Sequence, residues 1–357
     1  MSAGPHVLVP HDALASFCGK LLAWKNVRED VRRHVVASLV QTSLRGVDSH
    51  GIELLPHYIR ALDAGRINPN PRYGFKQTAP ASGLLDADHS FGHAAGGEAM
   101  GHAITMARSA GMAAVVVRSS SHFGAAAYFS LLAAGSDMIG ISCTHSTPHM
   151  LSYGGVRPYF STNPIAFAAP CSGEEPFCLD MATAMTTYNR VLEYKRQGKR
   201  LPADWGADAA GEPTMDPDKV LSMLPIGRYK GFGLAMMVDI LCSCLSGMPF
   251  GGHISLMYGD DVSQRRNLGH FVMAIDIGRF TPVAEFKSRL REMMDEVRSE
   301  PAKDPAVPVM VPGDPEKKAS LVRGREGVPV SGFVWDQLSS TAKQAGIPLP
   351  AVAKQGG

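Results

Sequence analysis

Two histidines occupy sequence settings that suit acid/base chemistry. His50 lies in the segment RGVDSHG (45–51), and His122 lies in SSSHFGAAAYF (119–129). An imidazole with a pKa near neutrality can accept and return a proton at physiological pH. Asp48 and Ser49 are close enough in sequence to His50 to orient its ring. The pattern predicts an acid/base site at His50, although a histidine that only caps or packs at a turn fits the same segment.

The position of His122 relative to the expected elements indicates a binding edge. It follows the apolar run AAVVV (113–117), which is typical of a strand buried on both faces, and it precedes a helix expected over 125–134. Ligands of open α/β sheets bind at the carboxyl ends of the strands. We therefore expect His122 to face a bound ligand.

The sequence does not predict a metal site. His89 and His93 are four residues apart, a spacing that can hold a metal on a helix, but Ser90 and Gly92 favour a loop and no third ligand is evident. A metallohydrolase built on Asp48 and His50 is an alternative that would need a bound metal. The six cysteines follow no disulfide framework, which fits a reducing, cytoplasmic compartment.

A Rossmann-type dinucleotide fingerprint is absent from the sequence. The nearest approach to Gly-x-Gly-x-x-Gly is GFGLAM (231–236), which has Met236 at the position of the third glycine. A tightly packed helix start explains these glycines better than a pyrophosphate cradle. Lys230, directly before them, could meet a phosphate or a carboxylate at the helix N-terminus.

The chain alternates short apolar runs with amphipathic helices, which predicts an α/β fold. The first 65 residues read as helices, and a helix over 281–300 is followed by a proline-rich linker over 302–317 and a last helix near 331–345. Strands are expected at 83–87, 113–117, 138–143, 165–169, 177–181 and 271–277.

These patterns divide the chain into two expected domains. The α/β domain covers residues 73–297, and a helical domain is formed by residues 1–72 together with 298–357. The apolar stretch 231–252 contains Asp239 and several glycines, so we expect a buried helix there rather than a membrane span.

The overall charge excludes polyanionic partners. The 35 Lys and Arg residues nearly balance the 33 Asp and Glu residues, which leaves 35 − 33 = +2. This balance provides no electrostatic footprint for nucleic acid or for an anionic membrane surface. With 45% hydrophobic residues the chain can bury a sizeable core. The 37 Gly and 25 Pro residues favour an enzyme rich in turns and loops.

An ordered series of motifs along the chain resembles the malate/L-lactate dehydrogenase family, which also contains ureidoglycolate, sulfolactate and diketogulonate oxidoreductases and cyclic imino acid reductases. The motifs are RGVDSHG (45–51), SSSHFGAAAYF (119–129), IGISCTHSTP (139–148), YGGVRPYFSTNPIAFAAP (153–170), LDMAT (179–183), LPADWGADAAGEPT (201–214), YKGFGLAMMVD (229–239) and VPGDPE (311–316).

The resemblance implies a non-Rossmann mixed-sheet core that binds a nicotinamide cofactor, NAD or NADP with NAD favoured, and a homodimeric assembly. It implies reversible hydride transfer between the cofactor and a 2-hydroxy acid/2-oxo acid pair of the malate, lactate or ureidoglycolate type. A cyclic imino acid reductase and a catalytically inactive cofactor-binding homologue are the alternatives.

The resemblance also assigns site residues, position by position. His50 and His122 are both candidates for the acid/base, with Ser49 as relay partner. Substrate contacts fall on His50, Thr162, Asn163 and Arg190. Cofactor contacts fall on His122, Phe123, Gly124, Ala125, Ser146, Asp180, Met181, Ala182, Lys230, Pro312, Gly313 and Asp314.

Three positions depart from the family pattern. Many members carry an arginine four residues after the donor histidine that clamps the substrate carboxylate, and this chain has Leu54 there. Asn189-Arg190 replaces the usual Gly-Lys, and His145 replaces an asparagine. An apolar side chain cannot form a bidentate clamp, so the substrate carboxylate must be bound elsewhere or be absent.

Overall fold

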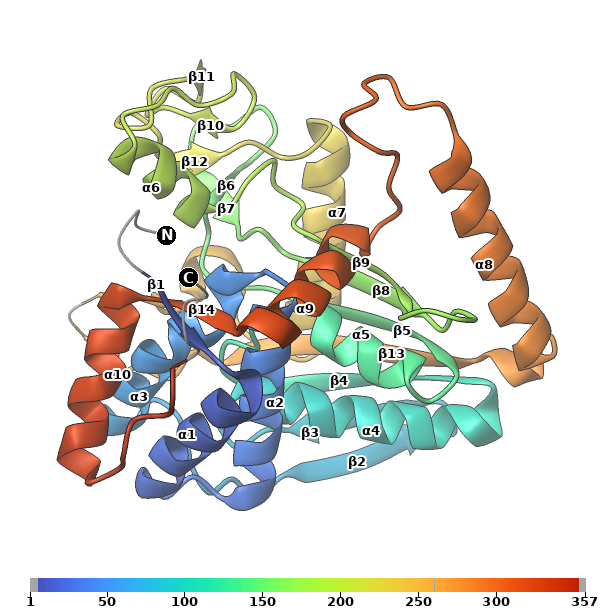
Figure 1. Cartoon of the computed structure of the whole chain (residues 1–357), viewed down its shortest axis with the longest axis horizontal. Helices are drawn as coiled ribbons and strands as arrows, with labels where there is room; N and C mark the ends of the chain where they lie inside the picture. The colour runs from blue at the N-terminus through green and yellow to red at the C-terminus, as the bar shows by residue number, and fades with distance from the viewer. Residues whose placement is uncertain (1–5, 260, 353–357) are drawn as a thin grey trace.

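The computed structural model describes residues 6–259 and 261–352, and a mixed seven-stranded sheet forms its centre (Figure 1). Strands β3 and β4 are parallel, and all other neighbours in this sheet are antiparallel. The order is β2 (Gly74–Ala79), β3 (Ser82–Asp86), β4 (Met112–Ser120), β13 (Leu268–Asp276), β5 (Met138–Thr144), β8 (Ile165–Ala169) and β9 (Phe177–Met181). The expected non-Rossmann mixed-sheet α/β fold is confirmed.

Helices cover both faces of the central sheet. On one face α4 (Gly92–Ala110) and α5 (Ala127–Ala134) share an apolar cluster with Val115 and Val117 of β4. On the other face Val116 packs with α7 (Tyr229–Asp239) and the π-helical turn Ile240–Cys244 that follows it. The β4 side chains thus alternate between two buried faces, as the run AAVVV predicted.

A second core joins the two ends of the chain. Helices α1 (His11–Trp24), α2 (Glu29–Leu44) and α3 (Leu55–Asp63) share one apolar cluster with α10 (Gly332–Ala345). Strand β1 (His6–Val9) pairs with β14 (Val328–Ser331) and adds to the same cluster. The described N- and C-terminal segments therefore pack as a helical layer beside the sheet (Figure 1).

A small five-stranded sheet and α6 (Tyr188–Arg196) form a separate lobe of the molecule (Figure 1). Its order is β11 (Pro213–Thr214), β10 (Gly206–Ala207), β12 (Ser222–Met223), β6 (Met150–Leu151) and β7 (Pro158–Phe160). These strands are too short for the periodicity of the sequence to reveal them.

Three expectations were wrong in detail. The first 65 residues are not all helical, because His6–Val9 forms strand β1. The linker ends early, because α9 (Asp314–Glu326) begins within it; Gly313 adopts φ +98° as N-cap, and Pro315 is tolerated in the first turn. Helix α7 is not fully buried, since Met236, Ile240 and Leu245 along it and after it are 49%, 49% and 58% exposed. Among the described helices, α8 (Val283–Ser299) included, none is both long and apolar enough to cross a membrane.

Candidate active site

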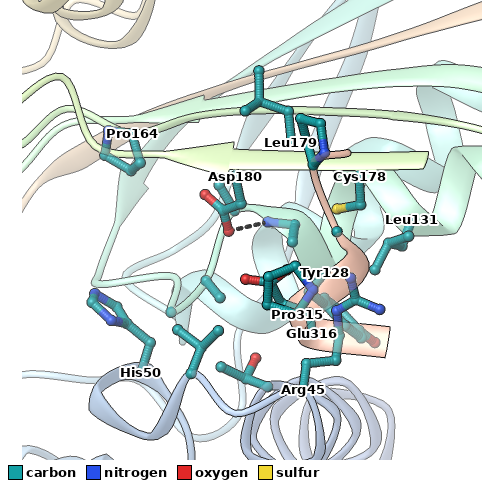
Figure 2. A pocket seen from close by; sticks show the side chains of 18 of the residues that line it. Arg45, His50, Tyr128, Leu131, Pro164, Cys178, Leu179, Asp180, Pro315 and Glu316 are labelled. Atoms are coloured by element: carbon teal, nitrogen blue, oxygen red, sulfur yellow. Dashed lines mark hydrogen bonds between the residues drawn. The ribbon is translucent and has the colours of Figure 1, made fainter. Parts of the chain in front are cut away.

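A cavity of about 530 Å³ opens between the end of α2, the N-terminus of α5, strand β9 and the start of α9. Figure 2 shows His50 and Pro164 at one end and Arg45, Cys178 and Glu316 at the other. The volume is that of a small-molecule or cofactor site. The predicted site residues that line it are Ser49, His50, Gly124, Ala125, Thr162, Asp180, Ala182, Pro312 and Gly313.

The turn that carries His50 is fixed from outside by α9 and α2. Both carboxylate oxygens of Asp48 accept hydrogen bonds from Arg323 of α9. A Cβ on Gly51 would lie 2.1 Å from Ser43 Oγ of α2, so only glycine permits this close packing. The expectation that Asp48 orients the His50 ring was wrong, because Arg323 occupies its carboxylate; Ser49 Oγ, 3.0 Å from His50 Nδ1, orients it alone.

His50 and His122 form a stacked pair, with ring centroids 5.7 Å apart. Tyr58 of α3 places its hydroxyl 2.7 Å from His122 Nδ1. Serine and tyrosine hydroxyls can both accept the Nδ1 proton, which leaves the Nε2 lone pair free. Each ring thus has one nitrogen held by the protein, and no described residue hydrogen-bonds its other nitrogen.

Burial keeps both rings neutral. Desolvation lowers the pKa of His50 below its usual 6.5. Desolvation also lowers the pKa of His122 well below 6.5, with further lowering by the charges of His50, His93, Arg266 and His57. A histidine that is neutral at pH 7 is a proton acceptor rather than a donor in the free protein.

The loop between β4 and α5 approaches the cavity through Gly124. This residue adopts φ +76°, and a Cβ there would lie 2.6 Å from Nε2 of the fully buried His93. Any side chain at position 124 would collide with His93 and strain the backbone. Glycine at position 124 therefore lets the loop pack against His93 where it lines the cavity.

Two carboxylates, Asp180 and Glu316, belong to the polar lining of the cavity. Asp180 of β9 accepts a 2.8 Å hydrogen bond from Ala127 N at the start of α5 (Figure 2). Desolvation, with a smaller contribution from the charge of nearby Glu316, raises the pKa of Asp180 to about 6. Arg45 is the one cation among the lining residues, and it pairs with Glu175 at 2.9 Å.

The C-terminal wall is braced by an ion cluster. Gly313 adopts φ +98°, and a Cβ there would lie 3.1 Å from the Cys178 carbonyl oxygen. Asp314 points away from the cavity: its carboxylate accepts from Arg298 of α8 at 2.6 Å and from Val311 N at 3.0 Å. Asp314 therefore holds the wall in place, while Pro312 and Gly313 face the cavity.

Several predicted site residues lie outside the cavity lining. Lys230 is exposed in the first turn of α7, and Arg190 is exposed on α6, where it pairs with Glu193. Phe123 is buried against His270, and Met181 ends β9. Asn163 Nδ2 donates to Ala235 O and to Asp239, and Ser146 Oγ accepts from Arg266.

Sequence reasoning missed four residues of this region. Arg45 lies in the motif RGVDSHG (45–51), and Glu316 lies in VPGDPE (311–316). Both motifs were already identified, so the sequence could have indicated these two residues. Tyr58 and Arg323 contact the site from α3 and α9. Only the tertiary fold brings these two side chains to the histidines.

The described residues contain no group of three or more His, Cys, Asp or Glu side chains that could hold a metal ion. His93 lies in α4 rather than in a loop, whereas His89 precedes that helix. Asp48 is paired with Arg323 and is not available as a ligand.

Comparison with known proteins gives one consistent family. The family model described as malate/L-lactate dehydrogenase matches residues 9–339. A malate dehydrogenase of Pyrococcus abyssi is 36% identical over 352 residues, 96% of each chain. A ureidoglycolate dehydrogenase (NAD(+)) of Escherichia coli K12 is 35% identical over 308 residues, 86% of this chain and 88% of the relative.

Solved structures agree with this result. The crystal structure of malate dehydrogenase from Entamoeba histolytica superposes with a TM-score of 0.91 at 29% identity, over 97% of this chain and 100% of that one. The shared architecture extends over both the central sheet and the helical layer.

Proposed function

The chain belongs to the malate/L-lactate dehydrogenase family, and we propose that it transfers a hydride between NAD and a 2-hydroxy acid/2-oxo acid pair at the cavity beside His50. The observation that carries this proposal is that His50 lines the cavity and stacks on His122, and that the protein hydrogen-bonds only Nδ1 of each ring. A ring nitrogen without a protein partner can take the proton, and the adjacent cavity can hold the cofactor that takes the hydride.

The cavity fits a nicotinamide dinucleotide. Gly124 and Gly313 both line the cavity with positive φ, and a Cβ on either would press against His93 or Cys178, so glycine lets the backbone turn tightly at the cavity wall. Ala125, Ala182 and Pro312 supply apolar contact. When bound, the nicotinamide ring supplies the hydride acceptor or donor.

The histidine pair supplies the proton chemistry. In the oxidation direction a neutral ring takes the hydroxyl proton on Nε2, while Ser49 or Tyr58 holds Nδ1. In the reduction direction the same nitrogen returns a proton to the developing alkoxide. His50 lines the cavity and is the proposed contact to substrate; His122, stacked behind it, is the second candidate.

We propose NAD rather than NADP as the cofactor. Asp180 and Glu316 place carboxylates in the lining, where they would repel a 2′-phosphate, and Arg45 is already paired with Glu175. The name of the Escherichia coli relative specifies NAD(+) as well.

A homodimer and a cytoplasmic setting complete the proposal. The exposed apolar side chains Met236, Met237, Ile240 and Leu245 form a patch that a second copy could cover. All six cysteines are free thiols, as in a reducing compartment. Light scattering at micromolar concentration tests the dimer, and Ile240→Asp is expected to shift it to monomer.

The test of function is direct. NADH and NADPH oxidation is followed with pyruvate, oxaloacetate, sulfopyruvate and a cyclic imino acid, and NAD reduction is followed with ureidoglycolate. Turnover of a 2-oxo or 2-hydroxy acid with NAD(H) is expected. Turnover of the imino acid alone would establish the reductase alternative, and NADH binding without any turnover would establish an inactive homologue.

A further inference from the structure

Arg266 is a buried guanidinium whose charge is only partly accommodated. It precedes β13, is 2% exposed, and donates from Nη2 to Ser146 Oγ at 2.9 Å and to Thr147 Oγ1 at 3.0 Å. Its Nε and Nη1 atoms are buried and have no hydrogen-bond partner among the described residues. A buried charge without a counter-ion destabilises a fold unless an anion joins it.

A second buried arginine reinforces the positive charge. Arg66 is 3% exposed, donates from Nη1 to Met257 O at 2.9 Å, and likewise leaves Nε without a described partner. Burial and the charge of Arg66 lower the pKa of Arg266 to about 9, which still leaves it charged at pH 7. Exposed Asp261 is the one described acid whose charge raises the pKa of Arg66.

Arg266 and His122 lie at the same end of β13 and β4, because Leu268 pairs with Ser120 in these antiparallel strands and both residues lie two positions beyond that pair. The charge of Arg266 lowers the pKa of His122, and it also acts on Tyr58, which hydrogen-bonds His122. Ser146, which holds the guanidinium, is one of the expected cofactor contacts. Leu54, where a clamp is expected, packs into the helical core at 8% exposure and cannot bind an anion.

We propose that Arg266 binds the carboxylate of the 2-hydroxy or 2-oxo acid, with Arg66 as the second positive charge of the same anion site. This assignment rests on the proposed function. Arg266 is not among the residues that line the cavity beside His50, so the substrate carboxylate must extend beyond that lining to meet it. Ser146 and Thr147 fix the guanidinium plane in advance, which lowers the entropic cost of binding. The bound anion also offsets the part of the lowering of the His122 pKa that comes from the charge of Arg266, and so increases the basicity of His122.

The experiment separates anion binding from cofactor binding. Oxamate, a carboxylate mimic of a 2-oxo acid, is titrated into the protein–NADH complex and followed by NADH fluorescence, and kcat and KM are measured with the best 2-oxo acid. Arg266→Met is expected to weaken oxamate binding and kcat/KM about 100-fold, with NADH affinity within about twofold of wild type. The matched control Arg60→Met removes an exposed arginine whose charge also reaches His57, and it should change neither quantity.

Two outcomes would overturn the proposal. One is wild-type oxamate affinity in Arg266→Met. The other concerns Arg266→Lys, which keeps the charge and serves where the methionine variant does not fold: its KM is expected to rise about tenfold with kcat within a few-fold, and an unchanged KM contradicts the assignment. Absence of NADH binding and of turnover in the wild type would instead refute the proposed function itself.

Discussion

Two pairs of histidines differ in how their ring nitrogens are used. His145 and His270 are fully buried, and the protein satisfies both nitrogens of each ring: Asp239 and Gly269 N for His145, Thr144 and Ser120 for His270. His50 and His122 each have only Nδ1 held by a protein group. The first pair is suited to hold β5 and β13 together, and the second is free to exchange protons.

This contrast explains why residue type alone does not locate the site. A histidine with both nitrogens bonded contributes to stability but cannot transfer a proton to a ligand without breaking the fold. A histidine with one nitrogen free is oriented by the protein and still reactive. Hydrogen-bond accounting therefore separates the structural pair from the proposed catalytic pair.

The largest expected effect is a loss of turnover when His50 or His122 is replaced, because only Nδ1 of each ring is held by the protein. His50→Gln and His122→Gln should each lower kcat by roughly 10² to 10⁴-fold, the usual range for loss of general acid/base catalysis. Steady-state NADH oxidation measures it, and circular dichroism checks the fold. Wild-type kcat in both variants would contradict the proposal that His50 and His122 are the catalytic pair.

The next effect is a loss of stability when a histidine of the fully hydrogen-bonded pair, His145 and His270, is replaced. His270→Leu leaves the hydroxyls of Ser120 and Thr144 without their imidazole partner, which should lower the free energy of unfolding by about 2–4 kcal/mol. Urea unfolding measures the change. His50→Leu is the matched control and should stay within about 1 kcal/mol of wild type; equal losses in the two variants would show that the pairs do not differ.

A smaller effect is expected at Tyr58. Tyr58→Phe removes the hydroxyl that holds His122 Nδ1 while keeping the ring that packs edge-on against His93. Losing this orientation should lower kcat about tenfold, the equivalent of one hydrogen bond of about 1.4 kcal/mol. A kcat within twofold of wild type would mean that the tyrosine only packs there.

Local sequence patterns predicted those structural features that depend on residues close together in the chain. The run AAVVV (113–117) identified β4, and RGVDSHG (45–51) identified the histidine turn with Ser49 as partner. The pairing of Asp48 with Arg323 spans 275 residues, and the placement of Tyr58 against His122 spans 64. Contacts of that range depend on the tertiary packing, which no local period encodes.

The same limit applies to charge. The overall balance of +2 argued only against nucleic acid and anionic membrane surfaces, and it could not reveal that Arg66 and Arg266 concentrate positive charge in the interior. Leu54 indicated that the substrate carboxylate is bound elsewhere or is absent. Arg266 is identified only in the folded chain, where its side chain is buried and its Nε and Nη1 atoms have no hydrogen-bond partner among the described residues.

The pH dependence of kcat/KM for oxidation of the 2-hydroxy acid tests the central claim most directly, because it reports ionisations of the free enzyme. Burial lowers the pKa of both His50 and His122 below 6.5, so the basic, neutral form is present at pH 7 and is lost only as the pH falls through the lowered values. The account predicts a histidine-dependent acid limb centred below pH 6.5, with a plateau above it, and no such limb in the glutamine variant of the ring that accepts the proton. A limb centred above pH 6.5, or one unchanged in both His50→Gln and His122→Gln, would contradict it.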